Sequence, residues 1–449
     1  MRDDLVERLS APVPRYTSYP TAPHFSESVG PDTYREWLGN LGGRNRLSLY
    51  VHIPYCDRLC WFCACHTRQT LRYEPVEAYL KGLFREIDTV GGMVSRDAAV
   101  TALHLGGGSP TMLRPQDMIA LKRSLSERFQ FATDAEISVE MDPNDLDEAR
   151  HDALAEIGLA RASLGIQDFD PKVQKAINRL QTFEQTRAVV EAVRSRGVRS
   201  VNCDVLYGLP HQTLASLGET VEAVVSMRPD RIALFGYAHV PWMKKHQAMI
   251  DAASLPGVAE RFRQMTMAAE MLVARGYQAV GIDHFALPAD PLASASRDGS
   301  LRRNFQGYTD DQADALIGLG ASAIGQLPEG YVQNMPATGE YLRSVNEGRL
   351  ASVRGYALTS EDRARAWVIE RIMCEFGFGL ECLRRAHPSL AATLIAEGRA
   401  IASADRDGLV QFGGGRFALT EKGQAFARTV ASRFDAHFGK GTARHSVAV

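Results

Sequence analysis

Short apolar runs alternate with longer amphipathic stretches between residue 47 and about residue 285. The amphipathic stretches, such as 76–88, 183–197 and 260–276, have the spacing of helices with one apolar face. Repeated strand–helix units with short connections predict an α/β fold whose parallel sheet curves into a partial barrel of about six units, with functional groups at the carboxyl ends of the strands. The expected strands are LSLYVHI (47–53), VTALHLG (100–106), AEISVEM (135–141), ARASLGI (160–166), VRSVNCDVLYG (198–208) and DRIALFGY (230–237).

Three further regions flank this βα core, which we place at 47–285. Residues 1–46 form an N-terminal arm, in which the prolines and aromatics of RYTSYPTAPHF favour an ordered extended segment. Residues 286–357 form an extension, in which RDGSLRRNFQGYTDDQ reads as a polar loop able to contact substrate. Residues 358–449 predict a small, mainly helical C-terminal domain with a β-hairpin within 407–427; its nearly balanced charge favours packing or substrate covering over nucleic-acid binding.

The whole-chain composition is that of a globular protein without an obvious polyanionic partner. The net charge of the 449 residues is −2, so we expect neither nucleic acid nor an anionic membrane surface as a partner. The charged start MRDDLVERLS and the lack of a run of about 18 apolar residues predict neither a signal peptide nor a membrane span. We therefore expect a cytoplasmic protein, in which clustered cysteines are better candidates for a metal site than for disulfides.

Four of the seven cysteines lie within ten positions of YVHIPYCDRLCWFCACHT. Their spacing, C-x3-C-x2-C-x-C, favours a [4Fe–4S] cluster held by three thiolates with one iron left open. Zinc and unligated thiols are the alternatives, although structural zinc sites usually pair two short clips separated by a longer loop. For Cys203, Cys374 and Cys382, which are scattered along the chain, we expect buried, structural positions.

Other motifs at the expected strand ends have both a structural and a functional interpretation. HLGGGSPT is either a tight turn or a place where the backbone approaches a ligand closely. Glu140 is either solvated or an acceptor for a ribose diol, and Tyr50 is either a core residue or a hydrogen-bond donor to the site. Arg302 and Arg303 either are solvated or pair with substrate carboxylates.

The three-cysteine spacing resembles that of the radical S-adenosylmethionine (SAM) superfamily. The series RYTSYPTAPHF, YVHIPYCDRLCWFCACHT, GGGSPT, VEMDP, GIQDF, NCDVLYGLP, GYAHVPW, GIDHFALP, NFQGYT and LIGLGASAIG further resembles the family of oxygen-independent coproporphyrinogen III oxidases. This resemblance implies that Cys56, Cys60 and Cys63 hold the cluster and that Tyr50 is catalytic. Because one iron must stay open for SAM, Cys65 cannot be a permanent fourth ligand, and we expect it to be catalytic instead. The resemblance implies SAM contacts for Tyr50, Phe62, Gly107, Gly108, Ser109, Glu140, Gln167, Arg179, Asp204, Ala238 and Ile324, of which Gln167, Arg179, Asp204 and Ala238 correspond to a second SAM site.

The reaction implied by the resemblance belongs to anaerobic haem biosynthesis. Coproporphyrinogen III would become protoporphyrinogen IX by oxidative decarboxylation of two propionates, started by a 5′-deoxyadenosyl radical. A one-electron donor such as flavodoxin or ferredoxin and an electron acceptor are then required, and we expect a monomer. A related haem-binding chaperone that lacks the fourth cysteine is the alternative, and an electron-transfer protein is a third hypothesis. Cys65 and the intact RYTSYPT segment favour the oxidase.

Overall fold

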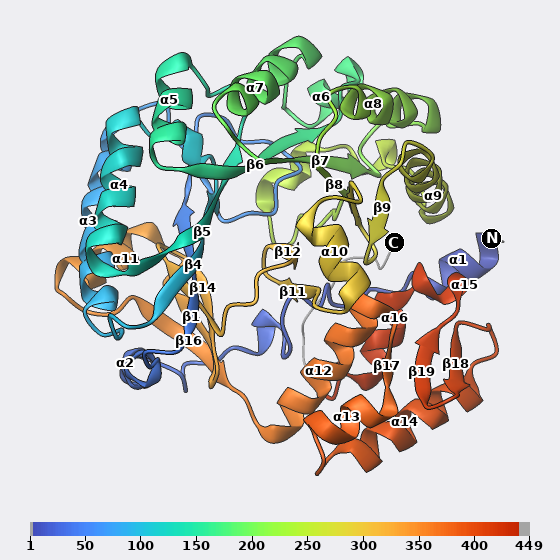
Figure 1. Ribbon diagram of the computed structural model, residues 1–449. Coiled ribbons are helices and arrows are strands. Elements are labelled where there is room, and N and C mark those ends of the chain that lie inside the picture. The colour runs from blue at the N-terminus through green and yellow to red at the C-terminus, as the bar shows by residue number, and fades with distance from the viewer. Residues whose placement is uncertain (1–2, 440–449) are drawn as a thin grey trace.

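A curved twelve-stranded sheet forms the centre of the computed structural model, which describes residues 3–439 (Figure 1). Six of its strands are parallel neighbours in chain order, so each strand–helix unit adds the next strand at one edge. Each overlaps one of the six predicted strands, which confirms the predicted α/β fold. They are β1 (Arg46–Ile53), β4 (Ala99–Gly107), β5 (Gln130–Met141), β6 (Leu159–Gln167), β7 (Ser200–Tyr207) and β8 (Arg231–Gly236).

Helices cover the outer, convex side of this sheet (Figure 1). The predicted helices at 76–88, 183–197 and 260–276 are confirmed, with ends that differ by a few residues at most. No helix within residues 3–439 is long and apolar enough to cross a membrane. The covering helices are α3 (Glu74–Gly91), α4 (Pro115–Arg128), α5 (Glu148–Glu156), α6 (Pro171–Ala176), α7 (Phe183–Ser195), α8 (Leu214–Ser226) and α9 (Val258–Ala274).

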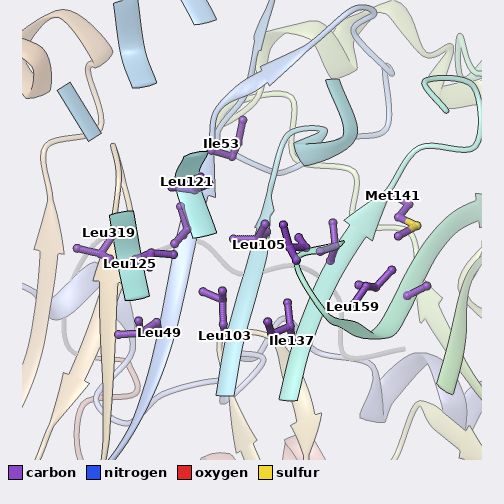
Figure 2. Packing of buried hydrophobic residues seen from close by; sticks show 14 of the residues in the cluster. Leu49, Ile53, Leu103, Leu105, Leu121, Leu125, Ile137, Met141, Leu159 and Leu319 are labelled. Atoms are coloured by element: carbon purple, nitrogen blue, oxygen red, sulfur yellow. The ribbon is translucent and has the colours of Figure 1, made fainter. Parts of the chain in front are cut away.

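The main core lies between the sheet and these helices, and Figure 2 shows part of it. Leu103 and Leu105 of β4 point to the same face as Leu49 and Ile53 of β1, because side chains alternate along a strand. Leu121 and Leu125, one turn apart on α4, close over this face. The six parallel strands therefore form a rigid base for the loops at their carboxyl ends.

Further strands extend the sheet at both edges, so the partial barrel stays open between β9 and β16. One of them, β13, is parallel to β1, and the others are antiparallel to their neighbours. The expected polar loop after residue 297 contains a hairpin of β11 and β12, so that interpretation is wrong in part. These elements are β9 (Gln278–Val280), β10 (His284–Ala286), α10 (Pro291–Asp298), β11 (Arg302–Asn304), β12 (Gly307–Thr309), β13 (Ala315–Leu319), β14 (Ile324–Leu327), β15 (Gly330–Asn334), α11 (Thr338–Asn346) and β16 (Ser352–Ala357).

The N-terminal segment and the C-terminal region share a second apolar cluster. Leu5 and Val6 of α1 (Asp3–Leu9) and Tyr16 pack with Phe426 and with Phe262 of α9. The predicted extended segment RYTSYPTAPHF is extended only in part, because a short 3-10 helix (Ala22–His24) lies within it, and α2 (Pro31–Asn40) follows. Residues 1–2 of the predicted arm and 440–449 of the predicted C-terminal domain lie outside the described residues.

The C-terminal region contains the predicted strand–turn–strand–helix order. A short third strand, β17, pairs with β19, and sequence patterning did not indicate it. Cys203 and Cys374 are buried as expected, whereas Cys382 is exposed, so that expectation is wrong for Cys382. The elements are α12 (Ser360–Glu375), β17 (Gly377–Gly379), α13 (Leu380–Ala386), α14 (Ala391–Ala404), β18 (Val410–Gly413), β19 (Arg416–Leu419), α15 (Glu421–Gln424) and α16 (Ala427–Ala431).

Candidate active site

The cysteine-rich loop leaves the carboxyl end of β1 and is fixed by backbone hydrogen bonds on one side. Two short parallel strands, β2 (Tyr55–Cys56) and β3 (Arg68–Gln69), bring its two ends together. The Trp61 N–H donates to the carbonyl of Ile177 at 2.9 Å, and the Asn178 side-chain amide donates to the carbonyl of Leu59 at 2.9 Å. The loop is therefore attached to the segment after α6.

A second segment, which follows β8, binds the same loop from another side. Lys244 Nζ donates to the carbonyl of Cys65 at 2.9 Å, and His246 Nε2 lies 2.7 Å from the carbonyl of Cys63. Gln247 Nε2 donates to the carbonyl of Phe62 at 2.9 Å. Because these bonds use backbone oxygens, they hold the loop while leaving the cysteine sulfurs available.

The donors around the sulfurs fit an iron–sulfur cluster. Arg179 Nη1 lies 3.6 Å from Sγ of Cys60, and the N–H of Cys65 lies 3.4 Å from Sγ of Cys63. Hydrogen bonding from Cys65 lowers the pKa of Cys63, whereas burial raises the pKa of Cys56 and Cys60. Cys56 and Cys60 therefore keep their protons until a metal ion displaces them, whereas Cys63 loses its proton more readily. When bound, N–H groups aimed at sulfur stabilise a cluster's charge.

Three glycines at the end of β4 allow close packing against three different residues, with Gly106 facing Glu140, Gly107 facing His52 and Gly108 facing Tyr55. A Cβ on Gly107, whose φ is +115°, would lie 2.7 Å from the His52 ring, and one on Gly108 would lie 2.5 Å from the carbonyl oxygen of Tyr55. The Gly107 N–H donates to Glu140 at 2.9 Å, and His104 Nε2 lies 3.3 Å from the other carboxylate oxygen. Burial would raise the pKa of Glu140, but these donors outweigh it and lower the pKa, so the carboxylate is ionised.

A cavity of about 370 Å³ opens beside the cysteine loop and collects five of the predicted residues. Its lining joins the ends of β1, β4 and β5 with β14 and the tip of the β11–β12 hairpin. The five are Tyr50, Cys65, Gly107, Glu140 and Ile324. Phe305, Gln306 and His52 also line it, and sequence reasoning did not select them, although Phe305 and Gln306 belong to the motif NFQGYT.

The Tyr50 hydroxyl donates its hydrogen bond to a neighbouring histidine. His52 Nε2 lies 2.8 Å from the carbonyl of His66, so that nitrogen carries the hydrogen, and His52 Nδ1 accepts from the Tyr50 hydroxyl at 2.9 Å. Burial lowers the pKa of His52 to about 4, which keeps the ring neutral. The Tyr50 oxygen therefore faces the cavity as an acceptor, not as the donor that we expected.

The other predicted SAM contacts do not line this cavity. Phe62 packs against the apolar cluster that includes Val173 and Ile177. The Ser109 hydroxyl bonds to Asp145 and lies 3.1 Å from Thr111 Oγ1, and the Gly108 N–H donates to the carbonyl of Ile53 at 2.8 Å. Ser109 and Gly108 therefore form their hydrogen bonds with other residues of the protein rather than facing the cavity.

The four residues predicted for a second SAM site fall in three places. Gln167, with φ of +69°, and Arg179 both approach Gly165, where a Cβ would lie 2.9 Å and 3.2 Å from their side-chain nitrogens. Asp204 lines a polar cavity together with Glu140, and burial raises its pKa to about 6. Ala238 lines a third cavity, described next.

This third cavity, of about 340 Å³, is rich in arginine. Arg15, Arg261, Arg303 and Arg428 line it, as do Phe305 and Gln306. Cys65 lines both this cavity and the one that contains Glu140. The exposed thiol of Cys65 therefore stands at the junction between the predicted cofactor site and a cationic chamber.

Comparisons with known proteins match two regions of the chain to families. The profile of the Radical SAM superfamily matches residues 50–224, which include the cysteine loop and Glu140. The profile of the HemN C-terminal domain matches residues 358–426.

Two full-length relatives carry the same name. The chain is 46% identical over 447 residues to an oxygen-independent coproporphyrinogen III oxidase of Paracoccus denitrificans, covering 99% of each chain. It is 45% identical to one of Bradyrhizobium diazoefficiens, covering 100% of each. The solved structure of coproporphyrinogen III oxidase (HemN) from Escherichia coli, described as a radical SAM enzyme, superposes with a TM-score of 0.90 at 38% identity, covering 94% of this chain and 98% of that one.

Proposed function

We infer that this chain, which belongs to the family of oxygen-independent coproporphyrinogen III oxidases in the radical SAM superfamily, converts coproporphyrinogen III to protoporphyrinogen IX by anaerobic oxidative decarboxylation. The observation that carries this proposal is the position of Cys65. Its thiol separates a cavity with a glutamate and glycine backbone from a cavity lined by arginines. A nucleoside cofactor and a polycarboxylate substrate would meet there.

Cys56, Cys60 and Cys63 would hold a [4Fe–4S] cluster, which together with bound SAM supplies the one-electron chemistry that starts hydrogen abstraction from a propionate. Glu140 would accept hydrogen bonds from the ribose, because its ionised carboxylate faces the cavity. Gly107 would give the backbone close access to the cofactor, and Ile324 supplies apolar surface to the same cavity. Tyr50, held by His52, offers an acceptor oxygen beside them.

Several further assignments belong to this proposal. Asp204 and Ala238, with Gln167 and Arg179, would contact a second SAM, and Phe62, Gly108 and Ser109 would support the first through the loop that they build. An external one-electron donor, flavodoxin or ferredoxin, and an electron acceptor would complete the cycle. We also propose a monomer in the cytoplasm, where reducing conditions keep the cysteines available for iron.

The alternative, a haem-binding chaperone without oxidase activity, is not favoured. The relatives at 46% and 45% identity are named oxidases over their full length. Cys65, the residue that the chaperone motif lacks, lies between the two cavities of this chain.

Anaerobic turnover tests the proposal. Protein reconstituted with iron and sulfide is incubated with dithionite, SAM and coproporphyrinogen III, and the porphyrins are oxidised and separated. We expect protoporphyrin to accumulate only when SAM is present. Haem binding without any turnover would support the chaperone instead and contradict the oxidase.

A further inference from the structure

Four arginines from four separate parts of the chain converge on the cavity of about 340 Å³. Arg15 belongs to the N-terminal segment, Arg261 to α9, Arg303 to β11 and Arg428 to α16. Asp283 is the one carboxylate among the described residues of the lining. The described lining therefore holds four guanidinium groups and one carboxylate.

Arg303 forms an ion pair with that single carboxylate, Asp283. Its side chain is 5% exposed, its Nη2 lies 3.7 Å from Asp283, and its guanidinium stacks 4.3 Å from the centre of the Tyr308 ring. Arg303, together with His284 at 2.7 Å, holds the pKa of Asp283 at about 2 against the effect of burial. The Nε and Nη1 atoms of Arg303 are nevertheless buried without a hydrogen-bond partner among the described residues. A buried guanidinium with unused N–H groups is costly unless a ligand supplies acceptors.

Arg261 has still fewer partners within the protein. Its Nε is buried without a hydrogen-bond partner among residues 3–439, and no carboxylate of that range forms an ion pair with it. Its guanidinium lies 6.0 Å from the centre of the Tyr207 ring. Burial lowers the pKa of Arg261, and the nearby charge of Arg15 lowers it further.

The remaining two arginines, Arg15 and Arg428, contact backbone oxygens of the described residues. Arg428 donates to the carbonyls of Val13 and Pro14 at 2.6 and 3.2 Å, and Arg15 Nη2 lies 3.4 Å from the carbonyl of Gly236. Burial and the charges of Arg15 and Arg303 lower the pKa of Arg428 to about 9. This mutual repulsion between cations would be relieved by an anion in the chamber.

We propose that Arg261 and Arg303, with Arg15 and Arg428, form the subsite that binds the propionate carboxylates of the substrate. This inference rests on the proposed function, because it takes the tetrapyrrole as the ligand. Guanidinium groups pair with carboxylates through two parallel hydrogen bonds, and all four arginines line the chamber that such carboxylates would enter. The N-terminal segment and the C-terminal region each contribute one arginine to this subsite, Arg15 and Arg428 respectively.

The neighbouring arginine on β11 provides a matched control. Side chains alternate along a strand, so Arg302 leaves the opposite face and pairs with Glu370 at 3.1 Å, with 48% of its side chain exposed. Arg302 does not line the cavity of the four arginines. Arg302→Gln and Arg303→Gln therefore remove the same charge one residue apart, on opposite sides of the hairpin.

Binding of a stable porphyrin tests the subsite without turnover. Anaerobically reconstituted protein is titrated with coproporphyrin III, the oxidised form of the substrate, and with its methyl ester, which lacks the negative charges; fluorescence reports both. Arg261→Gln and Arg303→Gln should each weaken coproporphyrin III binding by about tenfold or more while ester binding stays within about twofold of wild type. Arg302→Gln should bind both probes like wild type, and Arg261→Lys should recover part of the loss because it restores charge without the two-pronged geometry.

Two results would overturn the subsite. One is unchanged coproporphyrin III affinity in both Arg261→Gln and Arg303→Gln; the other is an equal loss for the acid and the ester, which would indicate a structural defect. Iron content and the response of the cluster to SAM, measured in each variant, should equal those of wild type. A wild-type protein that binds coproporphyrin III through these arginines but never decarboxylates coproporphyrinogen III would contradict the proposed function and leave the carboxylate subsite standing.

Discussion

The backbone N–H of Cys65 points at Sγ of Cys63 from 3.4 Å, while the Cys65 side chain lines both the Glu140 cavity and the arginine cavity. Cys65 thus contacts a predicted cluster ligand through both its backbone N–H and its side chain, and it also lines the cavity proposed for the substrate. The backbone contact survives a substitution of the Cys65 side chain, and a serine hydroxyl can replace the thiol as a hydrogen-bond donor. The structure therefore gives Cys65 a position beside the predicted cluster that does not require it to be a ligand.

Serine substitutions of the four cysteines should therefore fall into two groups. Cys56→Ser, Cys60→Ser and Cys63→Ser should abolish cluster assembly, because each removes one of three ligands. Cys65→Ser should retain about four irons per chain and the response of the cluster to SAM, but lose most of the decarboxylase activity. Iron, sulfide and turnover are measured in all four variants. Iron loss in Cys65→Ser equal to that in the other three variants would show that Cys65 is a ligand. Full decarboxylase activity in Cys65→Ser would show that the thiol has no role in turnover.

Glu140→Ala should weaken SAM binding and leave the cluster intact. The ionised carboxylate faces the cavity, and loss of a charge-assisted hydrogen bond costs about 1.5–3 kcal/mol, or at least about tenfold in affinity. Asp134→Ala on the same strand, at an exposed position, is the control and should bind SAM normally. Equal affinities in the two variants, measured by titration of the reconstituted proteins, would remove Glu140 from the cofactor site.

Replacing Arg179 should make the cluster harder to reduce. Its guanidinium lies 3.6 Å from Sγ of Cys60 and 3.1 Å from Asp142, so Arg179→Gln removes a positive charge and exposes the cluster to the field of a carboxylate. We expect the reduction potential to fall by on the order of tens of millivolts. Redox titration followed by electron paramagnetic resonance measures it, with the exposed Arg187→Gln on α7 as control. An unchanged potential with weakened SAM binding would instead favour a direct contact with the second SAM.

Glu86 should make the stability of the protein depend on pH. This buried carboxyl accepts from the Gly320 N–H and the Tyr341 hydroxyl at 2.7 Å each, and burial raises its pKa from 4.5 to about 7. Because the folded state holds the proton more tightly, the stabilisation is complete below pH 4.5 and decreases as the pH rises to about 7, by about 3 kcal/mol. Unfolding temperatures of Glu86→Gln should lack this decrease. The exposed Glu77→Gln on the same helix should keep the wild-type slope; identical slopes in all three proteins would contradict the assignment.

The features predicted most accurately from the sequence are those that local residue patterns determine. The six parallel strands were predictable because each is a short apolar run bounded by turn residues, and the cysteine spacing identified a cluster loop before its packing was known. The edge strands β9, β10 and β14 to β17 were not predicted, because strands of three to six residues carry little periodicity and are defined by distant partners.

Site residues were predictable only where they lie within a recognisable sequence motif. Tyr50, Gly107 and Glu140 lie at strand ends, and parallel strands bring such ends together. The burial of Arg303 beside the exposed Arg302 was not predictable, because the surrounding segment is polar and its hairpin depends on contacts with Glu370 and Asp283. The meeting of Arg15 with Arg428, 413 positions apart in the chain, is a tertiary feature without any local signal.

Transfer of a labelled hydrogen tests the central claim most directly. Coproporphyrinogen III deuterated at the β-carbons of its propionates is incubated anaerobically with the reconstituted protein, SAM and dithionite, and the products are analysed by mass spectrometry. We expect protoporphyrinogen IX with one deuterium lost from each vinyl group formed, and deuterium in the 5′-deoxyadenosine released. Deuterium-free 5′-deoxyadenosine, or its release without any decarboxylated porphyrinogen, would contradict the account.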